Sequence, residues 1–404
     1  MTTALSTRRI VVSGLGVVSS AGIGADRFWH RVIVDRPGDD HVEIDRADVA
    51  AQLTIRGTSH WSPAGKFAAV AATQAWAASG LDRSDGIRRG TVLATSLGSV
   101  ESMSRFDDEI ASVGARAVDP RIFTNTVHNH ATGLIGILQA TTGLNTTVSA
   151  GCASTADALD YAIRCLRGGS ADVMVVGGVD ERSRVVEKEF ERHGVLAKTL
   201  AQARPFSRAS DGIAPGEGAA VFVLETLDHL RRRGGRALAE IRGLGRRFVF
   251  PTTSEADVIE RQMTAMCEAL AGAALAPRDV GYVEASANGL VAMDGRESQS
   301  LLRMFYGGGT PVAALKGRIG ECFGASDALQ IARAVGALAR GRVPATPRAP
   351  DDQLMIGGTL DAPEPAQFSA VLVNAFNPVG LQASVVIAQL DSDEVRPDGP
   401  TAHV

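Results

Sequence analysis

The chain has 404 residues, of which 45% are hydrophobic and 21% charged, with 44 glycines and a formal net charge of −4. This length exceeds what one hydrophobic core usually supports, so two packed units of roughly 150–200 residues are expected. The small negative charge excludes the basic footprint of a protein that binds nucleic acid or an anionic membrane, and we expect a small-molecule or protein partner instead.

The first residues, STRRIVVSGLGVVSSAGIGA, place arginines before an apolar stretch, as a secretory signal does. Glycine and serine interrupt the stretch throughout, so we interpret it as a first strand and turn. No apolar run approaches the ~18 residues of a membrane span. The four cysteines (Cys152, Cys165, Cys267 and Cys322) are too few and too scattered for a disulfide framework. The sequence also contains no CxxC motif, which would be typical of a zinc site. We therefore expect a cytoplasmic protein without a membrane or metal partner.

Short β-branched runs alternate along the chain with alanine- and leucine-rich windows of helical length. Strands that are apolar throughout indicate a sheet covered by helices on both faces. The pattern therefore predicts an α/β fold. The expected strands cover residues 8–16, 90–99 and 171–179, and the expected helices cover residues 64–81 and 156–169.

The segment LETLDHLRRRGGRALAEIRGLG contains a strand end, a basic helix that two glycines stop, and a new strand. We place the boundary between two halves here, at residues 8–236 and 237–390. Residues 35–48 are predicted to form a surface loop and residues 391–404 a flexible tail, because both are polar.

The two halves share a short internal similarity. NTTVSAGCASTADAL (145–159) aligns with LKGRIGECFGASDAL (315–329) at a constant offset of 170, which sets Cys152 against Cys322. Each copy is predicted to be a strand, a turn and a helix. If the repeat is genuine, the two helix N-termini are related by pseudo-symmetry and meet near the centre of the molecule.

Cys152 lies in VSAGCASTADAL, which indicates the end of a strand, a tight turn and the start of a helix. A lone cysteine in an apolar context is more often packed than reactive. At a helix N-terminus, however, free N–H groups and the positive end of the helix dipole favour the thiolate. These residues alone leave open whether Cys152 is a nucleophile.

Several other segments share motifs with one family: VVSGLGVVSSAGIG, PRIFTNTVHNHATG, ADVMVVGGVDE, RPFSRASDGIAPGEGAAVFVLE and VPATP. With these and the Cys152 turn, residues 8–390 resemble the β-ketoacyl-acyl carrier protein synthases of fatty acid and polyketide assembly. The resemblance implies a thiolase-like fold, in which duplicated βαβ halves form an αβαβα layered arrangement.

The resemblance also implies a two-step acyl transfer. A cysteine thiolate takes an acyl chain from the phosphopantetheine arm of an acyl carrier protein; a malonyl unit then loses carbon dioxide, and its enolate attacks the cysteine thioester. Two histidines stabilise the enolate, and two backbone N–H groups hold the oxyanion at the cysteine. The implied partner is the acyl carrier protein, and no cofactor is implied.

The resemblance can be carried over position by position. Cys152 stands at the nucleophile position. The family's His-Gly-Thr-x-Thr motif matches SANGL, which places Ser286 at the first histidine. The Lys-x-x-x-Gly-His motif matches KGRIGE, which keeps Lys316 and places Glu321 at the second histidine. Both histidines are therefore expected to be replaced.

The family's glycine-rich loop, Asn-Ser-Phe-Gly-Phe-Gly-Gly, matches NAFNPVG, which contains Phe376, Asn377, Pro378 and Gly380. In the family the second phenylalanine of this loop gates the pocket and donates the other oxyanion N–H. Pro378 stands at that place, and proline has no N–H to donate. His130 is expected on a segment that lines a pocket or contacts another subunit.

These replacements oppose decarboxylative condensation. The loss of one oxyanion donor typically costs ~3 kcal/mol, or about 10²–10³ in rate. An ionised Glu321 near Cys152 is expected to raise the thiol pKa and to repel the malonyl carboxylate and the enolate. The family has a non-condensing branch, the chain length factors, which lack the catalytic set and pair with an active ketosynthase. Cys152 departs from that branch, which usually carries glutamine there.

We therefore expect a chain-length-factor-like subunit that forms a heterodimer with a complete ketosynthase, or else a homodimer. The alternative is a diverged acyltransferase that acylates itself on Cys152 and passes the acyl group to a hydroxyl or an amine, with Glu321 as its base. A third reading is a thiolase-like scaffold with a pocket too closed for an acyl chain.

Three further motifs have simpler interpretations. GLGVVS resembles part of a dinucleotide-binding fingerprint but lacks its third glycine, so we do not expect NAD binding. His128 and His130 form an HxH pair without a surrounding ligand set, so they are interpreted as polar residues rather than metal ligands. HLRRRGG is either a docking site for an acidic carrier protein or a solvated helix end.

Overall fold

The computed structural model describes residues 8–38, 40–82, 86–305, 309–348 and 353–390, so the predicted tail at 391–404 lies outside the described residues. Within these ranges eleven strands form one mixed sheet. The strand β2 (Gly22–Ile23) is a short addition to β1, and β10 (Arg342–Val343) pairs separately with β11 (Glu364–Pro365).

The other ten strands of the sheet fall into two groups with the same internal order. The first group is β4 (Asn145–Val148), β3 (Arg89–Ala94), β5 (Val173–Asp180), β6 (Gly218–Thr226) and β1 (Ile10–Ser19), in spatial order. The second is β9 (Val312–Ala313), β8 (Tyr282–Glu284), β12 (Ala370–Phe376), β13 (Gly380–Ala388) and β7 (Ala239–Val249).

The pairing directions also match between the groups. Strands β3 and β5 are parallel, as are β8 and β12, and each group ends in antiparallel pairs. The groups join where Ile10–Val12 of β1 pairs with Ala239–Ile241 of β7. The predicted α/β fold with duplicated halves is therefore confirmed. The predicted boundary at 236/237 falls between α8 (Leu227–Arg232) and β7, and it stays a prediction.

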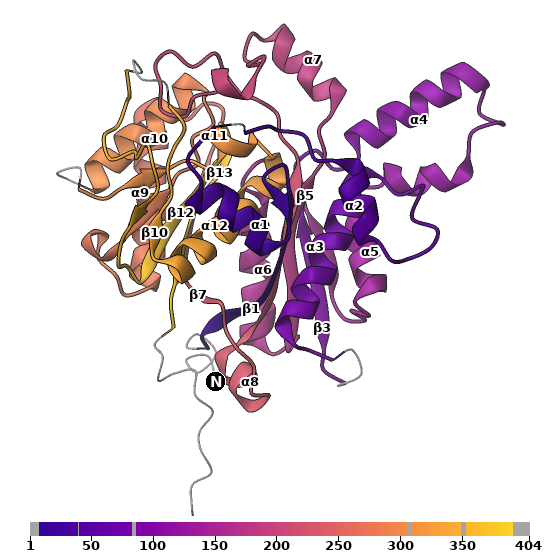
Figure 1. Cartoon of the computed structure of the whole chain (residues 1–404), viewed down its shortest axis with the longest axis horizontal. Helices are drawn as coiled ribbons and strands as arrows, with labels where there is room; N and C mark the ends of the chain where they lie inside the picture. Colours follow the sequence, from indigo (N-terminus) through magenta and orange to yellow (C-terminus); the bar gives the residue numbers. More distant parts are fainter. Residues whose placement is uncertain (1–7, 39, 83–85, 306–308, 349–352, 391–404) are drawn as a thin grey trace, which may run out of the picture.

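Helices cover both faces of the sheet in three layers (Figure 1). The helix α3 (Pro63–Ser79) packs on the outer face of the first half, and α9 (Glu255–Gly272) and α10 (Val291–Met304) pack on the outer face of the second. Between the halves lie α6 (Ser154–Gly168) and α12 (Ser326–Arg340). This order gives the expected αβαβα arrangement.

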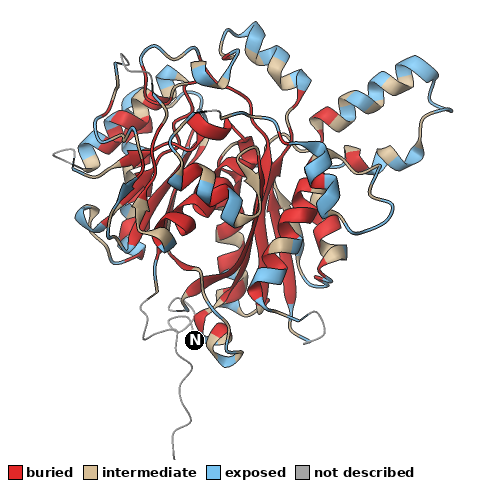
Figure 2. Cartoon of the chain, viewed as in Figure 1, coloured by how far each residue is buried: buried red, intermediate tan, exposed pale blue. Residues whose placement is uncertain are grey.

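The middle helix α12 is the most buried element of the second half. All its residues from Ser326 to Leu338 are buried, and Figure 2 shows it inside the fold. The buried residues include Asp327, Gln330 and Arg333, and Arg333 forms an ion pair with Glu284, so the helix lies in the core although its sequence is not apolar on all sides.

The helices α6 and α12 are equivalent, but not at the predicted offset. They begin at Ser154 and Ser326 and end before Gly169 and Gly341, both left-handed, so the two ends lie 172 residues apart. Each first serine also accepts a hydrogen bond from the N–H four residues before it. The predicted alignment of Cys152 with Cys322 is therefore wrong by two residues. A match between two segments rich in alanine and glycine does not show at which residue each helix begins.

The predicted surface loop at 35–48 ends in a helix, since α2 (Arg46–Gln52) begins with Asp45 as its N-cap. None of the described helices combines the length and the apolarity needed to cross a bilayer. The short helix α11 (Lys316–Ile319) is fully buried. Further helices are α1 (Ala25–Trp29), α4 (Val100–Val113), α5 (His130–Leu138) and α7 (Arg184–Arg192).

Glycines on the first strand of each half bring a helix backbone against the strand. A Cβ on Gly16 of β1 would lie 2.0 Å from the carbonyl oxygen of Ala71 in α3. The same contact recurs in the second half, where a Cβ on Gly245 of β7 would lie 2.0 Å from the carbonyl oxygen of Ala265 in α9. The close strand-helix packing of both halves therefore depends on the absence of a side chain.

Replacement of Gly16 with alanine should lower the free energy of unfolding by about 3 kcal/mol, because the strand and α3 must separate to admit the methyl group. Urea unfolding measures this loss. Gly168→Ala is the matched control: it lies in α6 with nothing within 4 Å of a new Cβ, so a gain of about 0.5–1 kcal/mol is expected. Equal unfolding free energies for wild type and Gly16→Ala would show that the contact is not tight.

Candidate active site

Cys152 lies in the turn between β4 and α6, as predicted. Gly151, immediately before it, has a φ of 79°, a left-handed conformation that glycine adopts without strain. Cys152 as a whole residue is half-buried, its sulfur lies inside the protein, and its thiol forms no disulfide. The Ser154 N–H donates to the Gly151 carbonyl at 3.1 Å, which closes the turn into the helix.

The side chain of Asn377 braces this turn from the second half of the chain. Its Nδ2 donates to the Ala150 carbonyl at 2.9 Å, and its Oδ1 accepts from the Ala153 N–H at 3.0 Å. These two bonds span Cys152 on both sides. They also occupy one of the N–H groups at the start of α6 that would otherwise face a substrate or a thiolate.

Lys316 and Glu321 form a buried ion pair in the same region. Lys316 Nζ lies 2.9 Å from Glu321 Oε2, and the two side chains are 3% and 2% exposed. Burial opposes ionisation of both groups. The charge of Lys316 nevertheless lowers the pKa of Glu321, and the charge of Glu321 raises the pKa of Lys316, so the pair is ionised at neutral pH.

Every acceptor position of the Glu321 carboxylate is filled. Oε2 accepts from Lys316 and, at 2.9 Å, from Asn288 Nδ2. Oε1 accepts from Ser326 Oγ at 2.6 Å and from the Phe323 N–H at 3.0 Å. A carboxylate offers about four acceptor sites. Glu321 therefore has none left for the proton of a substrate.

The pKa of the Cys152 thiol is raised well above its usual value. Burial is the main cause, the negative charge of Glu321 adds to it, and the positive charge of Lys316 opposes it. The expectation that the helix N-terminus favours the thiolate is therefore wrong here, because burial and a neighbouring carboxylate outweigh the helix dipole. The expected effect of Glu321 on the thiol is confirmed.

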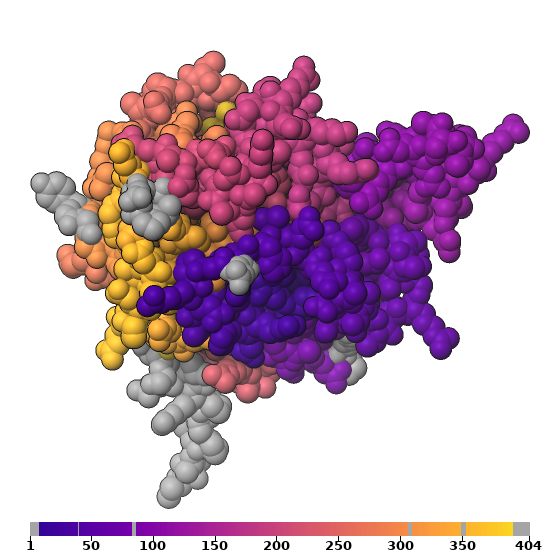
Figure 3. All heavy atoms as spheres, turned by 45° about the horizontal axis from the view of Figure 1, so that its top comes forward, coloured from indigo at the N-terminus to yellow at the C-terminus, as the bar shows by residue number. Residues whose placement is uncertain are grey.

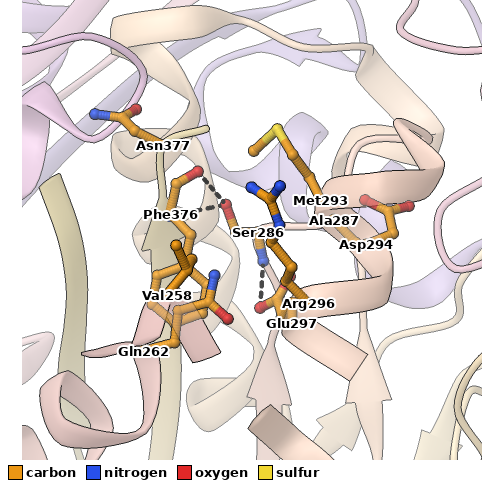
Figure 4. A pocket seen from close by; sticks show the side chains of 10 residues that line it. All are labelled: Val258, Gln262, Ser286, Ala287, Met293, Asp294, Arg296, Glu297, Phe376 and Asn377. Carbon is orange, nitrogen blue, oxygen red and sulfur yellow. Dashed lines mark hydrogen bonds between the residues drawn. The ribbon is translucent and has the colours of Figure 1, made fainter. Parts of the chain in front are cut away.

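Ser286 is also held in structural hydrogen bonds (Figure 4). It follows β8, and its Oγ accepts from the Phe376 N–H at 3.0 Å. Its own N–H donates to Glu297 Oε1 at 3.0 Å. At 3% exposure, the hydroxyl joins β8 to the end of β12 rather than facing solvent.

The loop after β12 is anchored at its base and exposed at its tip. The Asn377 N–H donates to the Leu381 carbonyl at 3.0 Å, and Gln382 Nε2 donates to the Asn377 carbonyl at 2.7 Å. Pro378 lies in the exposed bend that follows, and Gly380, with a φ of 105°, returns the chain to β13. Pro378 has no N–H to offer from this bend.

His130 lies away from these residues, at the start of α5. Its ring packs against Gly65 of α3, and it lines a second small pocket together with Thr95 and His128. Burial, with a smaller effect of His60, lowers the pKa of His130. Its Nε2 is buried and has no hydrogen-bond partner among the described residues. Ser286, Phe376 and Asn377 line a different small pocket (Figure 4), and His130 is not among the residues that line it.

Two residues of the site carry no signal in the family motifs. Asn288 and Ser326 donate to Glu321, yet each is a common polar residue in a loop or at a helix start. Asn288 stands two positions after Ser286, within the matched segment. A buried carboxylate at position 321 needs hydrogen-bond donors, and only this argument could have identified Asn288 from the sequence.

Burial raises the pKa of Glu297 to about 7, although it accepts hydrogen bonds from the Ser286 N–H and from Asn374. A pKa that is higher in the folded than in the unfolded chain means that protonated Glu297 stabilises the fold. This contribution to the free energy of unfolding is fully present below about pH 4.5 and is lost as pH rises through about 7. Glu297→Gln keeps a neutral acceptor at Oε1. The variant should therefore be about 2 kcal/mol more stable than wild type at pH 8.

Urea unfolding at several pH values measures this difference. It should vanish near pH 4.5, grow up to about pH 7 and then stay constant. Glu255→Gln, an exposed change in the first turn of α9, is the control and should leave the pH dependence unchanged. A Glu297→Gln curve parallel to the wild-type curve would mean that folding does not change the pKa of Glu297.

Comparisons with known proteins find similar sequences over most of the chain. Family models match two segments: "Beta-ketoacyl synthase, N-terminal domain" at residues 52–229 and "Beta-ketoacyl synthase, C-terminal domain" at residues 238–349. The oxytetracycline polyketide putative beta-ketoacyl synthase 1 of Streptomyces rimosus is 30% identical over 95% of this chain and 97% of its own length. The 3-oxoacyl-[acyl-carrier-protein] synthase 2 of Coxiella burnetii is 25% identical over 96% and 100%.

Solved structures share the fold. A structure titled the ishigamide ketosynthase/chain length factor has a TM-score of 0.83, with 24% identity over 95% of this chain and 100% of the other. A structure of a type II polyketide acyl-carrier protein in complex with its ketosynthase has a TM-score of 0.82, with 23% identity over the same shares. The thiolase-like architecture expected from the sequence is therefore confirmed.

Proposed function

Because the chain belongs to the β-ketoacyl synthase family, we propose that it is a chain-length-factor-like subunit, which pairs with a catalytically complete ketosynthase and does not condense on its own. In this role it shapes the pocket that holds a growing acyl chain in polyketide or fatty acid assembly. Its ligand is the acyl group that an acyl carrier protein presents.

The main support is the state of the residues at the catalytic positions. Glu321 has its acceptor sites filled, Ser286 is bonded to the Phe376 backbone, and Asn377 spans the turn that carries the thiol. Pro378 lacks the N–H that an oxyanion would need. Each of these groups stabilises the folded chain, and none is left to polarise a malonyl thioester.

A surface near the cysteine turn supports pairing with a second subunit. Strand β4 is an edge strand among the described residues, and Cys152 follows its end by four residues. Exposed apolar side chains gather in the preceding segment, where Phe123, Val127 and Ile137 are 57%, 44% and 79% exposed. Edge strands and exposed apolar groups are typical of subunit interfaces. We propose that the partner ketosynthase docks on this β4–α5 surface.

The carrier-protein partner is supported by the relatives. One neighbouring structure is titled as an acyl-carrier protein in complex with its ketosynthase, and one relative is named 3-oxoacyl-[acyl-carrier-protein] synthase 2. We propose the same class of partner for this chain, whether it forms a heterodimer or a homodimer.

The test is condensation with and without a partner. The purified chain should form no β-ketoacyl product from acetyl and malonyl carrier protein, whereas the chain mixed with its catalytically complete partner ketosynthase should form one. Ile137→Glu should abolish copurification with that ketosynthase. The control Leu302→Glu also replaces an exposed apolar residue with glutamate, but it lies on α10 and should leave copurification unchanged. Product formation by the chain alone would refute the proposal.

The retained Cys152 thiol is the one observation that favours the alternative, a self-acylating transferase. Its expected base, Glu321, has a lowered pKa and no free acceptor site, which argues against that role. Mass spectrometry of the intact protein after exposure to acyl carrier protein distinguishes the two. Acylation that Cys152→Ala abolishes, followed by transfer to a hydroxyl or amine, would establish the transferase.

A further inference from the structure

A groove opens between α2, α3, α4 and the 3-10 helix at Pro120–Thr126, with a volume of about 520 Å³. It lies where α4 stands out from the body of the molecule (Figure 3). Its volume is typical of small-molecule sites, which span roughly 300–1,000 Å³. None of the candidate active-site residues lines it, so it is a separate site from the cysteine turn.

Three aromatic side chains line this α2–α4 groove: Trp61, Phe67 and Phe106. The guanidinium of Arg46 lies over the Phe67 ring, 4.8 Å from its centroid. Flat apolar surfaces of this kind favour a planar ligand, because rings stack face to face or edge to face on one another.

The charges that line the groove are mostly positive. Arg46, Lys66 and Arg105 line it, against a single lining carboxylate, Glu109. Each arginine also forms an ion pair with a buried carboxylate: Arg46 with Glu217 and Arg105 with Glu101. An arginine has five N–H donors, so donors remain for a ligand.

Lys66 is the cation with the fewest partners. Its Nζ donates to the Ser59 carbonyl at 3.4 Å, and within the described ranges no carboxylate forms an ion pair with it. It therefore offers an ammonium at the groove that is not already neutralised. A charge-assisted hydrogen bond from such a group to a ligand oxygen is worth more than a neutral one.

We propose that the α2–α4 groove binds a planar aromatic anion of small-molecule size, such as an aromatic carboxylate, sulfonate or phenolate. The rings of Trp61 and Phe106 hold the aromatic part, and the buried Phe67 ring supports Arg46 from below. Lys66, with the free N–H groups of Arg46 and Arg105, holds the anion. This ligand site does not depend on Cys152, but its lining residue Phe106 contacts Phe123 of the proposed docking surface, so the binding experiment uses the chain without a partner.

The probe is 1-anilinonaphthalene-8-sulfonate, an aromatic anion with a flat naphthalene ring system. It should bind at one site per chain and accept excitation energy from Trp61. Lys66→Glu should weaken binding about tenfold or more, since the variant replaces an attractive contact with a repulsive one. Trp61→Leu should weaken binding and remove most of the energy transfer. Lys198→Glu, an exposed change outside the groove, should alter neither.

Two further ligands separate the contributions of ring and charge. N-phenyl-1-naphthylamine has the same rings without the sulfonate and should bind more weakly than the sulfonate, with no response to Lys66→Glu. Inorganic phosphate has the charge without the rings and should compete only weakly. Tight phosphate competition, equal binding of the uncharged amine, or binding that Lys66→Glu and Trp61→Leu both leave intact would overturn the proposal.

Discussion

Replacement of Glu321 with leucine should lower the free energy of unfolding by about 3–5 kcal/mol. The variant leaves the ammonium of Lys316 buried, without the carboxylate that lies 2.9 Å from it. It also removes the acceptor of Ser326 Oγ and of the Phe323 N–H, which then stay buried and unpaired. Urea unfolding of both proteins measures the loss.

The double variant Lys316→Met, Glu321→Leu separates the charge from the shape of the site. It removes both charges, and well-packed apolar residues replace a buried ion pair at little or no cost, so most of the lost stability should return. Arg164→Ala is the matched control, because it breaks an ion pair on α6 whose arginine is 71% exposed, and should cost at most about 0.5 kcal/mol. A Glu321→Leu loss no larger than that of the control would show that Lys316 is not held by Glu321.

The sequence predicted the fold well where a pattern is local. The apolar run at residues 8–16 became β1, buried along its whole length, and the alanine-rich window at 64–81 became α3. The turn, the cysteine and the helix at 148–159 also lie as expected. These elements follow from composition and periodicity over ten to eighteen residues, which tertiary contacts did not override.

The contacts of the candidate site were not predictable in the same way. Asn377 reaches the Cys152 turn across 224 residues of chain, and Ser286 meets Phe376 across 90. A motif shows which residue type stands at a position, and it does not show which backbone groups that residue will satisfy. The identity of the replacements was therefore accessible from sequence, while their incorporation into structural hydrogen bonds needed three-dimensional coordinates.

The raised pKa of Cys152 shows the same limit. The helix N-terminus that follows the cysteine was visible in the sequence and favours a thiolate. Burial of the sulfur and its proximity to Glu321 are tertiary properties, and they decide the direction of the shift. The prediction that Glu321 opposes the thiolate was correct because it depended only on the sign of one charge.

Cys152 should react with iodoacetamide at pH 8 at least about tenfold more slowly than Cys267, since each unit of pKa difference changes the thiolate fraction about tenfold. Cys267 is exposed on α9, so the same protein sample supplies the reference thiol. The Lys316→Met, Glu321→Leu double variant removes the neighbouring carboxylate but leaves the sulfur buried. It also removes the ammonium of Lys316, which opposes that carboxylate, so the thiol pKa should fall only slightly and the rate at Cys152 should stay well below the unchanged rate at Cys267.

The pH dependence of Cys152 alkylation, followed peptide by peptide with mass spectrometry, tests most directly whether this thiol has lost its catalytic activation. We expect the Cys152 rate to keep rising up to the most alkaline pH at which the protein stays folded, with no plateau near neutrality. A rate that levels off below pH 8 and exceeds that of Cys267 would reveal an activated thiolate, and would contradict a non-condensing role for this chain.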